Sequence, residues 1–199
     1  MKPTKIDVHE HREPDYPVEE LFLRRWSSRA LSGEPLSEED LGSLFEAARW
    51  APSSYNGQPW RFLYARRDGE HWDELFDLMV EYNQGWAKGA GGLIVVLSRK
   101  TFEHNDKPAR THSFDAGAAW MALALQAAAR GLVAHAMQGF DYDRAREVLE
   151  IPEEYEVECM VAVGHPGEIS ELPEKLRERD KPSSRKAVSE LAFEGRLPG

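Results

Sequence analysis

Apolar residues recur at helical spacing in several segments of the chain, and this spacing predicts helices there. The clearest case lies between Ser37, a good N-cap, and Pro52, which ends a helix. Acidic residues follow Ser37 in the first turn, where the helix dipole favours negative charge. The buried stripe of this helix is expected to be Leu41, Leu44, Phe45 and Ala48. The same spacing predicts further helices over 18–25, 71–84, 115–131 and 141–149.

The helix over 115–131 is expected to be central. Eight of its seventeen residues are alanine, which has the highest intrinsic preference for the helix. Small side chains on several sides let neighbouring elements approach closely, and a helix that is apolar all round has to be buried. We therefore expect it at the centre of the molecule or of a dimer.

Short apolar runs predict the strands. They are expected over 59–65, at 93–98, within 132–140 before a turn, and from 158 to the break at Gly-His-Pro-Gly, 164–167. The run at 93–98 is continuously aliphatic, which is typical of a central strand that is buried on both faces.

The chain is predicted to form one domain over 18–199, preceded by an irregular arm at 1–17. The polar connection 99–112 is longer than most loops of a compact domain. It is interpreted as a lid or substrate loop, or as a mobile insertion. From residue 168 onward the chain is charged and rich in proline, so this extended C-terminal segment is expected either to be disordered or to lie across a partner subunit.

Composition indicates a cytoplasmic protein that has no membrane partner. The chain has 199 residues, of which 41% are hydrophobic and 30% are charged. Its longest aliphatic run, 93–97, is far shorter than the roughly 20 residues of a membrane helix, and its first residues lack the apolar stretch of a secretion signal. The single cysteine, Cys159, cannot form an internal disulfide, which suits a reducing compartment.

The charge pattern argues against nucleic acid but leaves room for one small anion. A net charge of -10 disfavours nucleic-acid binding. The spacing of His9 and His11 is compatible with a metal ligand pair, but without further close-spaced ligands a solvated pair is favoured, and the same holds for the scattered histidines. One phosphate needs only two or three cations. In 24–29, "RRWSSR", Arg25 and Arg29 would share a face if this turn were helical, and with Ser27 they would grip a phosphate. Alone, the segment is better explained as a solvated basic surface that pairs with the many acids of the chain.

The connection "APSSYNGQPWRF" at 51–62 raises a similar question. Asn56-Gly57 is a turn signal, and the neighbouring serines and Gln58 either satisfy the loop backbone or bind a polar ligand. The phosphate loop of nucleoside triphosphatases, the glycine fingerprint of dinucleotide-binding folds and the nucleophile motif of serine hydrolases do not occur in the sequence.

Six segments follow one another along the chain: "RRWSSRAL", "APSSYNGQPWRF", the alanine-rich helix, "AMQGFD", "VAVGHPGE" and "SSRK". In this order they resemble the FMN-dependent nitroreductase family from about residue 19 to residue 191. The resemblance implies an α+β fold, namely a three-layer α/β/α sandwich with a central mixed, mainly antiparallel sheet, in an intertwined homodimer. It implies FMN as cofactor, NADH or NADPH as electron donor, and a small-molecule acceptor such as a nitroaromatic or a quinone, in a ping-pong scheme.

The resemblance also implies roles for individual residues. The phosphate of FMN would be held by Arg25, Ser27, Arg29 and Arg185. A loop that reaches over the flavin of the second subunit would contain Pro52, Ser53, Ser54 and Asn56. The turn beneath the ring would be Met137, Gln138 and Gly139, and Asn83 or Gln84 would face the pyrimidine side.

The sequence departs from the family pattern at two of the expected cofactor-binding positions. Trp26 stands where the family often has a smaller or imidazole side chain, and Gln138 stands where an acidic residue can occur. No side chain is expected to be catalytic, because the flavin carries the redox chemistry. The alternatives are a flavoenzyme with another reaction, such as reductive dehalogenation or activated-alkene reduction, a non-enzymatic flavin-binding protein, and a structural dimer without cofactor.

Overall fold

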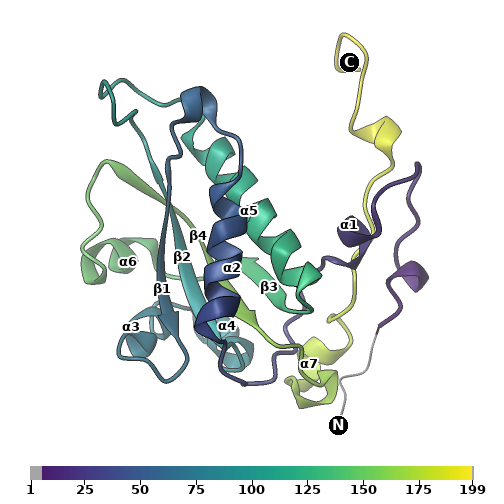
Figure 1. Cartoon of the computed structure of the whole chain (residues 1–199). Helices are drawn as coiled ribbons and strands as arrows, with labels where there is room; N and C mark the ends of the chain where they lie inside the picture. Colours follow the sequence, from purple (N-terminus) through teal and green to yellow (C-terminus); the bar gives the residue numbers. More distant parts are fainter. Residues whose placement is uncertain (1–5, 199) are drawn as a thin grey trace.

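The computed structural model describes residues 6–198 as a four-stranded sheet between two layers of helices (Figure 1). The strands are β1 (Trp60–Arg66), β2 (Gly92–Arg99), β3 (Val133–Met137) and β4 (Tyr155–Gly164). The helices are α1 (Glu20–Arg24), α2 (Glu38–Arg49), α3 (Trp72–Phe76), α4 (Glu81–Ala87), α5 (His112–Ala129), α6 (Tyr142–Val148) and α7 (Glu174–Arg177). Four 3-10 turns complete the described residues: η1 (Val8–Glu10), η2 (Ser54–Asn56), η3 (Ile169–Glu171) and η4 (Val188–Glu190).

The sheet has the strand order β1-β2-β4-β3, and every neighbouring pair is antiparallel. The prediction of a mainly antiparallel sheet is confirmed, and the parallel pairing of the expected mixed sheet does not occur among the described strands. β2 is the central strand foreseen from its aliphatic run, and β4 begins three residues before the predicted start. Between Val96 and Leu97 the register of β2 against β4 shifts, so that Glu158 is an extra residue in β4.

The two faces of the sheet pack against different helices, which confirms the three-layer prediction. Along β2, Leu93, Val95 and Leu97 belong to the core cluster that includes residues of α3, α4 and α6. Ile94 and Val96 belong to the cluster formed with α2 and α5. Successive side chains of a strand point to opposite faces, so one aliphatic run supplies both cores. Figure 1 shows α2 and α5 side by side across one face.

The predicted helices at α2 and at α5 are confirmed, whereas the expected burial of α5 on all sides stays a prediction, because part of its surface is exposed in this chain. Ser37 is the N-cap of α2, where its Oγ accepts the N–H of Asp40 at 3.0 Å. α5 begins three residues before the predicted start and ends two residues before the predicted end. Four of its alanines, Ala116, Ala119, Ala124 and Ala127, belong to the buried cluster formed with α2 and the sheet, so small side chains permit the close approach of the layers.

The prediction of a single helix over 71–84 is wrong, because the segment is broken into α3 and α4. Met79 forms an isolated antiparallel bridge with Phe140. The N–H of Val80 donates to the carbonyl of Gly139 at 3.0 Å, and the carbonyl of Leu78 accepts from the N–H of Asp141 at 2.9 Å. Backbone bonds to a segment about sixty residues away therefore replace the helical ones.

The expected helical turn around Arg25 is also wrong. α1 ends at Arg24, and Arg25 has extended dihedral angles (φ -69°, ψ 110°), so Arg25 and Arg29 do not share a helical face. Two distant side chains hold this segment extended. The Arg12 guanidinium donates to the carbonyls of Leu23 and Arg25, and the Asp180 carboxylate accepts the N–H of Arg29.

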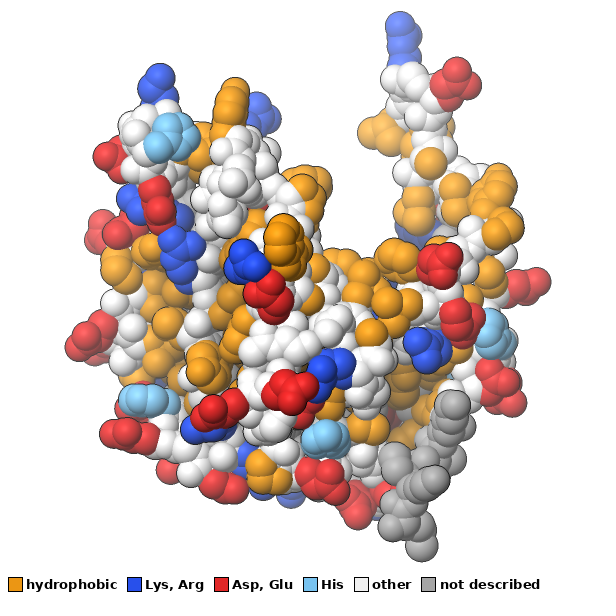
Figure 2. All heavy atoms as spheres, in the orientation of Figure 1, with side chains coloured by type: hydrophobic (Ala, Val, Ile, Leu, Met, Phe, Trp, Pro, Cys, Tyr) orange, Lys and Arg blue, Asp and Glu red, His pale blue; other side chains and the backbone are white. Residues whose placement is uncertain are grey.

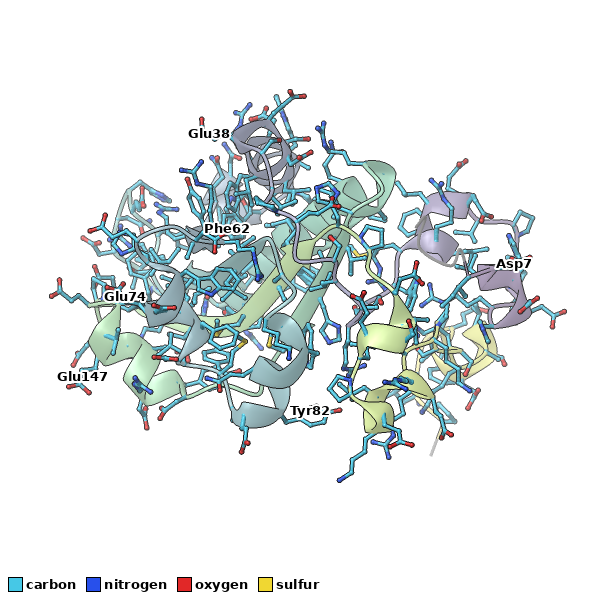
Figure 3. All side chains as sticks on the ribbon, turned by 90° about the horizontal axis from the view of Figure 1, so that it is seen from below. Asp7, Glu38, Phe62, Glu74, Tyr82 and Glu147 are labelled. Atoms are coloured by element: carbon cyan, nitrogen blue, oxygen red, sulfur yellow. The ribbon has the colours of Figure 1, made fainter. Side chains whose placement is uncertain are left out.

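The chain on both sides of the sheet domain is ordered by contacts within the chain. Leu172, Leu176 and Asp180 are buried, so the first part of the C-terminal segment packs on its own chain. The expected contact of this segment with a partner subunit stays a prediction. The following residues, 181–198, lie beside the N-terminal segment that begins near Asp7 (Figure 3). There the N–H of Val188 donates to Asp15 Oδ2 at 2.6 Å. The domain boundary at residue 17 stays a prediction.

The connection 99–112 forms a turn with its own bridge between Thr101 and Pro108. The ring of Phe102 stands edge-on to the ring of Tyr55 with centroids 5.7 Å apart. This connection therefore supports the loop that follows α2. Within residues 6–198, each helix is too short or too polar to span the hydrocarbon core of a membrane.

Replacing Val95 by Ala should lower the free energy of unfolding by about 2 kcal/mol, because Val95 is fully buried in the central strand and the change leaves a cavity. The measurement is urea unfolding at one fixed protein concentration. Val148→Ala is the matched control, since Val148 is 42% exposed on α6. Equal losses in the two variants would contradict the assignment of β2 as the centre of the core.

Candidate functional site

Three arginine side chains from three separate segments interact electrostatically, and we call them the arginine cluster: Arg12, Arg25 and Arg185. None of them forms an ion pair with another described residue. Burial lowers the pKa of Arg25, and the charge of Arg185 lowers it further. Burial likewise lowers the pKa of Arg12, followed by the charges of Arg185 and Arg25. The cluster is therefore a concentration of uncompensated positive charge, which favours binding of an anion.

Hydroxyl groups and a groove accompany the cluster. Arg25 Nη1 lies 3.4 Å from Ser27 Oγ, and Arg185 Nη1 donates to Ser183 Oγ at 2.7 Å. Arg12 and Arg185 also line a groove of about 760 Å³ between the N-terminal and C-terminal segments. Arginine forks beside hydroxyls form a donor set suited to a phosphate group.

Arg29 was expected in the same phosphate clamp, but the structure directs its charge elsewhere. Its Nη1 lies 3.9 Å from the buried carboxylate of Asp180, and its guanidinium stands 5.9 Å from the ring centroid of Trp86. Its Nε is buried and has no hydrogen-bond partner among residues 6–198. Arg29 thus has a counter-ion and one unused donor. The half-buried Trp26 follows Arg25 on the same extended segment.

Asp180 was not foreseen, because an acid in a highly charged segment gives no sequence signal. Its carboxylate accepts hydrogen bonds from Ser28 Oγ at 2.6 Å and from the N–H groups of Arg29 and Ala30 at 2.8 and 3.4 Å. The carbonyl of Ser28 in turn lies 3.2 Å from Nδ1 of the buried His135. A C-terminal acid and a β3 histidine thereby fix the segment that follows Arg25.

The turn at 137–139 is held by Asn83. Its Nδ2 donates to the carbonyl of Gly139 at 2.9 Å, and its Oδ1 accepts from Trp86 Nε1 at 3.1 Å. A Cβ at position 139 would lie 2.4 Å from Asn83 Nδ2, so this approach requires glycine. Both polar groups of Asn83 are therefore used within the protein. Gln84 Nε2 donates to the carbonyl of Phe76 at 3.2 Å, on the other side of the helix break.

His135 connects these two regions. Its ring packs on the ring of Trp86 with centroids 4.6 Å apart, and Trp86 contacts Asn83 as described. Burial lowers the pKa of His135, and the charge of Arg29 lowers it further. The hydrogen bond to the Ser28 carbonyl opposes this effect. A neutral imidazole with the proton on Nδ1 is the form that satisfies the carbonyl.

The loop after α2 has a strained backbone. Tyr55, Asn56 and Gln58 have positive φ angles of 51°, 53° and 44°, a region that residues other than glycine rarely adopt. Strain of this kind persists only where the surroundings impose it, and it collects at functional sites. The loop also contains the predicted residues Pro52, Ser53 and Ser54.

Asp115 on α5 anchors this loop and was also missed by sequence reasoning. Its Oδ2 accepts the N–H of Ser54 at 3.0 Å and the hydroxyl of Thr111 at 3.2 Å. The carboxylate is almost fully buried at the start of α5, where the positive end of the helix dipole stabilises it. Within the loop, Ser53 Oγ accepts the N–H of Gln58 at 3.0 Å.

The structure keeps the loop and the arginine cluster apart in one chain. The loop lies at one end of α2, whereas the cluster lies beside α1 and the C-terminal segment (Figure 1). No hydrogen bond or ion pair among the described residues joins them. Figure 2 shows the C-terminal segment standing clear of the body, with hydrophobic side chains on both sides of the hollow between them. Trp50, Tyr55 and Phe114 are 73%, 87% and 80% exposed, which is typical of a protein interface.

Comparison with known proteins gives one consistent family. The model described as the nitroreductase family matches residues 23–83 and 70–165. The chain is 34% identical over 144 residues to an uncharacterized 15.4 kDa protein of Mycolicibacterium smegmatis, which covers 68% of this chain and 96% of that one. It is 25% identical over 177 residues to a protein of Streptomyces coelicolor named as an NADH dehydrogenase/NAD(P)H nitroreductase, which covers 79% of this chain and 89% of that one.

A solved structure is more similar still. The crystal structure of an oxidoreductase containing FMN superposes with a TM-score of 0.91 at 48% sequence identity. The match covers 94% of this chain and 96% of that chain. At this identity nearly all of the chain has a counterpart of known structure.

Replacing Asp115 by Ala should loosen the loop, because the Ser54 N–H and the Thr111 hydroxyl lose their acceptor. We expect faster hydrogen exchange over 52–58 and a loss of about 1–3 kcal/mol in the free energy of unfolding. Hydrogen–deuterium exchange measured by mass spectrometry checks the first effect. Asp143→Ala on the exposed side of α6 is the matched control, and equal exchange of the loop in both variants would refute the anchor.

Replacing His135 by Gln should remove part of the pH dependence of stability. The pKa of His135 is lowered in the folded chain, so between that lowered value and about 6.5 the unfolded chain binds more protons. The native protein therefore loses stability as the pH falls through this window, and the variant should lose less. Urea unfolding from pH 7 to pH 5 measures the difference. His104→Gln, at an exposed position, is the control, and an unchanged slope in His135→Gln would contradict the burial argument.

Proposed function

Since this chain belongs to the nitroreductase family, we propose that it is an FMN-dependent oxidoreductase. It takes electrons from NADH or NADPH and reduces electron-poor small molecules such as nitroaromatics or quinones. Donor and acceptor would use the same site in turn, in ping-pong order. The observation that carries the proposal is the arginine cluster, whose positive charges have no counter-ion among residues 6–198 although the chain is acidic.

The donor set fits a mononucleotide phosphate. Arg25, Ser27 and Arg185 present guanidinium and hydroxyl donors close together. Arg29 is held by Asp180 and its Nε is buried, so its proposed part is to add positive charge near the phosphate and not to donate directly. Burial and then the charge of Arg185 lower the pKa of Arg25, and a phosphate dianion would relieve the second of these effects. The half-buried Trp26 would border the bound phosphate group.

The turn at Met137, Gln138 and Gly139 offers further donors for the flavin ring. The carbonyl of Gly139 already accepts from Val80 and Asn83. The N–H groups of Gln138 and Gly139 have no hydrogen-bond partner within residues 6–198. Exposed backbone donors on a fixed turn are suited to the electron-rich edge of a heterocycle. Asn83 would then act by holding the turn.

The redox chemistry, hydride acceptance from a reduced nicotinamide and reduction of a second substrate, is supplied by FMN when bound. The protein's part is to bind, orient and shield. No side chain is assigned a catalytic role in this proposal, because no step requires one to gain or lose a proton.

A second copy of the chain would complete the site. The loop with Pro52, Ser53, Ser54 and Asn56 projects away from the arginine cluster of its own chain, and large apolar side chains flank it. In the proposed intertwined homodimer, this loop covers the flavin held by the other subunit. The cytoplasmic location expected from the single cysteine belongs to the same proposal.

The purified protein should contain FMN, and anaerobic NADH or NADPH should bleach its visible absorbance. Adding a nitroaromatic or a quinone should restore the colour. Retention of the flavin with no bleaching would favour a non-enzymatic flavin-binding protein. Bleaching followed by reoxidation only with halogenated compounds or activated alkenes would favour another reaction on this fold. A protein that takes up no FMN from excess would end the proposal.

Replacing Arg25 by Ala should weaken FMN binding by about 1.5–3 kcal/mol, the usual contribution of a charge-assisted hydrogen bond. The dissociation constant, measured from quenching of flavin fluorescence on titration of the apoprotein, should therefore rise roughly ten- to a hundredfold. Arg24→Ala is the matched control, because Arg24 is exposed and adjacent and makes no side-chain hydrogen bond in the described structure. Equal effects of the two changes would argue against a specific clamp.

A further inference from the structure

Arg12 is buried although it lies in the N-terminal segment, and its guanidinium binds backbone carbonyls only. Nε donates to the carbonyl of Ser183 at 3.1 Å. Nη1 donates to the carbonyls of Leu23 and Arg25, at 2.5 and 2.9 Å. The side chain is 9% exposed and forms no ion pair with another described residue. Burying a cation without an acid partner costs free energy, and hydrogen bonds to carbonyls offset only part of this cost.

The three carbonyls belong to the two segments that carry the other members of the arginine cluster. Leu23 and Arg25 lie at the end of α1, and Ser183 lies two residues before Arg185. The Ser183 carbonyl also accepts from Arg185 Nη1 at 3.3 Å. One guanidinium therefore joins chain segments that are separated by about 160 residues and that present Arg25 and Arg185.

A neutral or acidic side chain could join these two segments without adding positive charge. The chain has 35 acidic residues, yet the contact is made by a third cation beside two others. In the absence of an anion, this arrangement adds repulsion to the cluster. A fork of fixed N–H donors can bind several carbonyls at once, which a lysine ammonium cannot do in the same geometry. The arrangement lowers the stability of the ligand-free site, and it fixes the positions of the cations before a ligand binds.

We propose that Arg12 is a positioning residue of the phosphate site: by binding the carbonyls of Leu23, Arg25 and Ser183, it holds Arg25 and Arg185 so that both face one phosphate. The inference rests on the proposed function, since the phosphate is that of FMN. Arg12 acts through the backbone of its neighbours, so its effect is confined to the phosphate end of the ligand.

The test compares FMN with riboflavin, which has the same ring and lacks the phosphate. Apoprotein of the full chain is titrated with each ligand, using the native protein, Arg12→Lys and Arg12→Gln. Both variants should raise the dissociation constant for FMN about tenfold and leave that for riboflavin within about twofold. Arg179→Lys is the control, because Arg179 is exposed in the same C-terminal segment. Native binding of FMN by Arg12→Lys would overturn the inference, since charge alone would then suffice.

Equal weakening of FMN and riboflavin would also overturn it, because the residue would then have a general structural role. A double-mutant cycle gives a second readout. In the Arg185→Ala background, Arg12→Lys should raise the dissociation constant for FMN by less than a further twofold. If the two residues acted independently, the factors by which the two substitutions raise the dissociation constant would multiply. A native protein that binds neither ligand would refute the proposed function itself. Native FMN binding with unaffected Arg12 variants refutes only the role of Arg12.

Discussion

The repulsion among Arg12, Arg25 and Arg185 is the constraint around which this end of the molecule is built. In a chain with ten more negative than positive charges, carboxylates are available everywhere, and none pairs with these three side chains in the described structure. The surrounding chain supplies carbonyls and hydroxyls, which orient guanidinium groups without neutralising them. The positive charge therefore stays without a neutralising group among residues 6–198, as the proposed phosphate site requires.

The rest of the fold places the other candidate groups on rigid supports. The aliphatic strand β2 builds two cores at once, and α5 lies against one of them. From α5 comes Asp115, which fixes the loop after α2. His135 lies on β3 and contacts the segment after Arg25. Through Trp86 and Asn83 it is connected to the turn at Gly139. Groups held by packed elements keep their geometry better than groups on free loops.

Local sequence patterns were sufficient to predict the helices and strands that contacts between neighbouring residues determine. The cap at Ser37, the apolar stripe of α2, the alanine-rich α5 and the aliphatic β2 are all properties of contiguous residues. The break between α3 and α4 was not predictable in this way, because its cause lies at residues 139–141. The motif residues around Arg25 were found, but their extended backbone depends on Arg12 and Asp180, which look like ordinary surface charges in the sequence.

The left-handed residues Tyr55, Asn56 and Gln58 have a consequence for association. Asp115 and hydrogen bonds inside the loop fix these unusual dihedral angles when the chain folds. The free-energy cost of ordering the loop therefore belongs to folding and not to association with another molecule. A surface that meets this loop meets a rigid projection. Contact with it then costs little chain entropy, and even a small area of buried aromatic surface contributes almost fully to affinity.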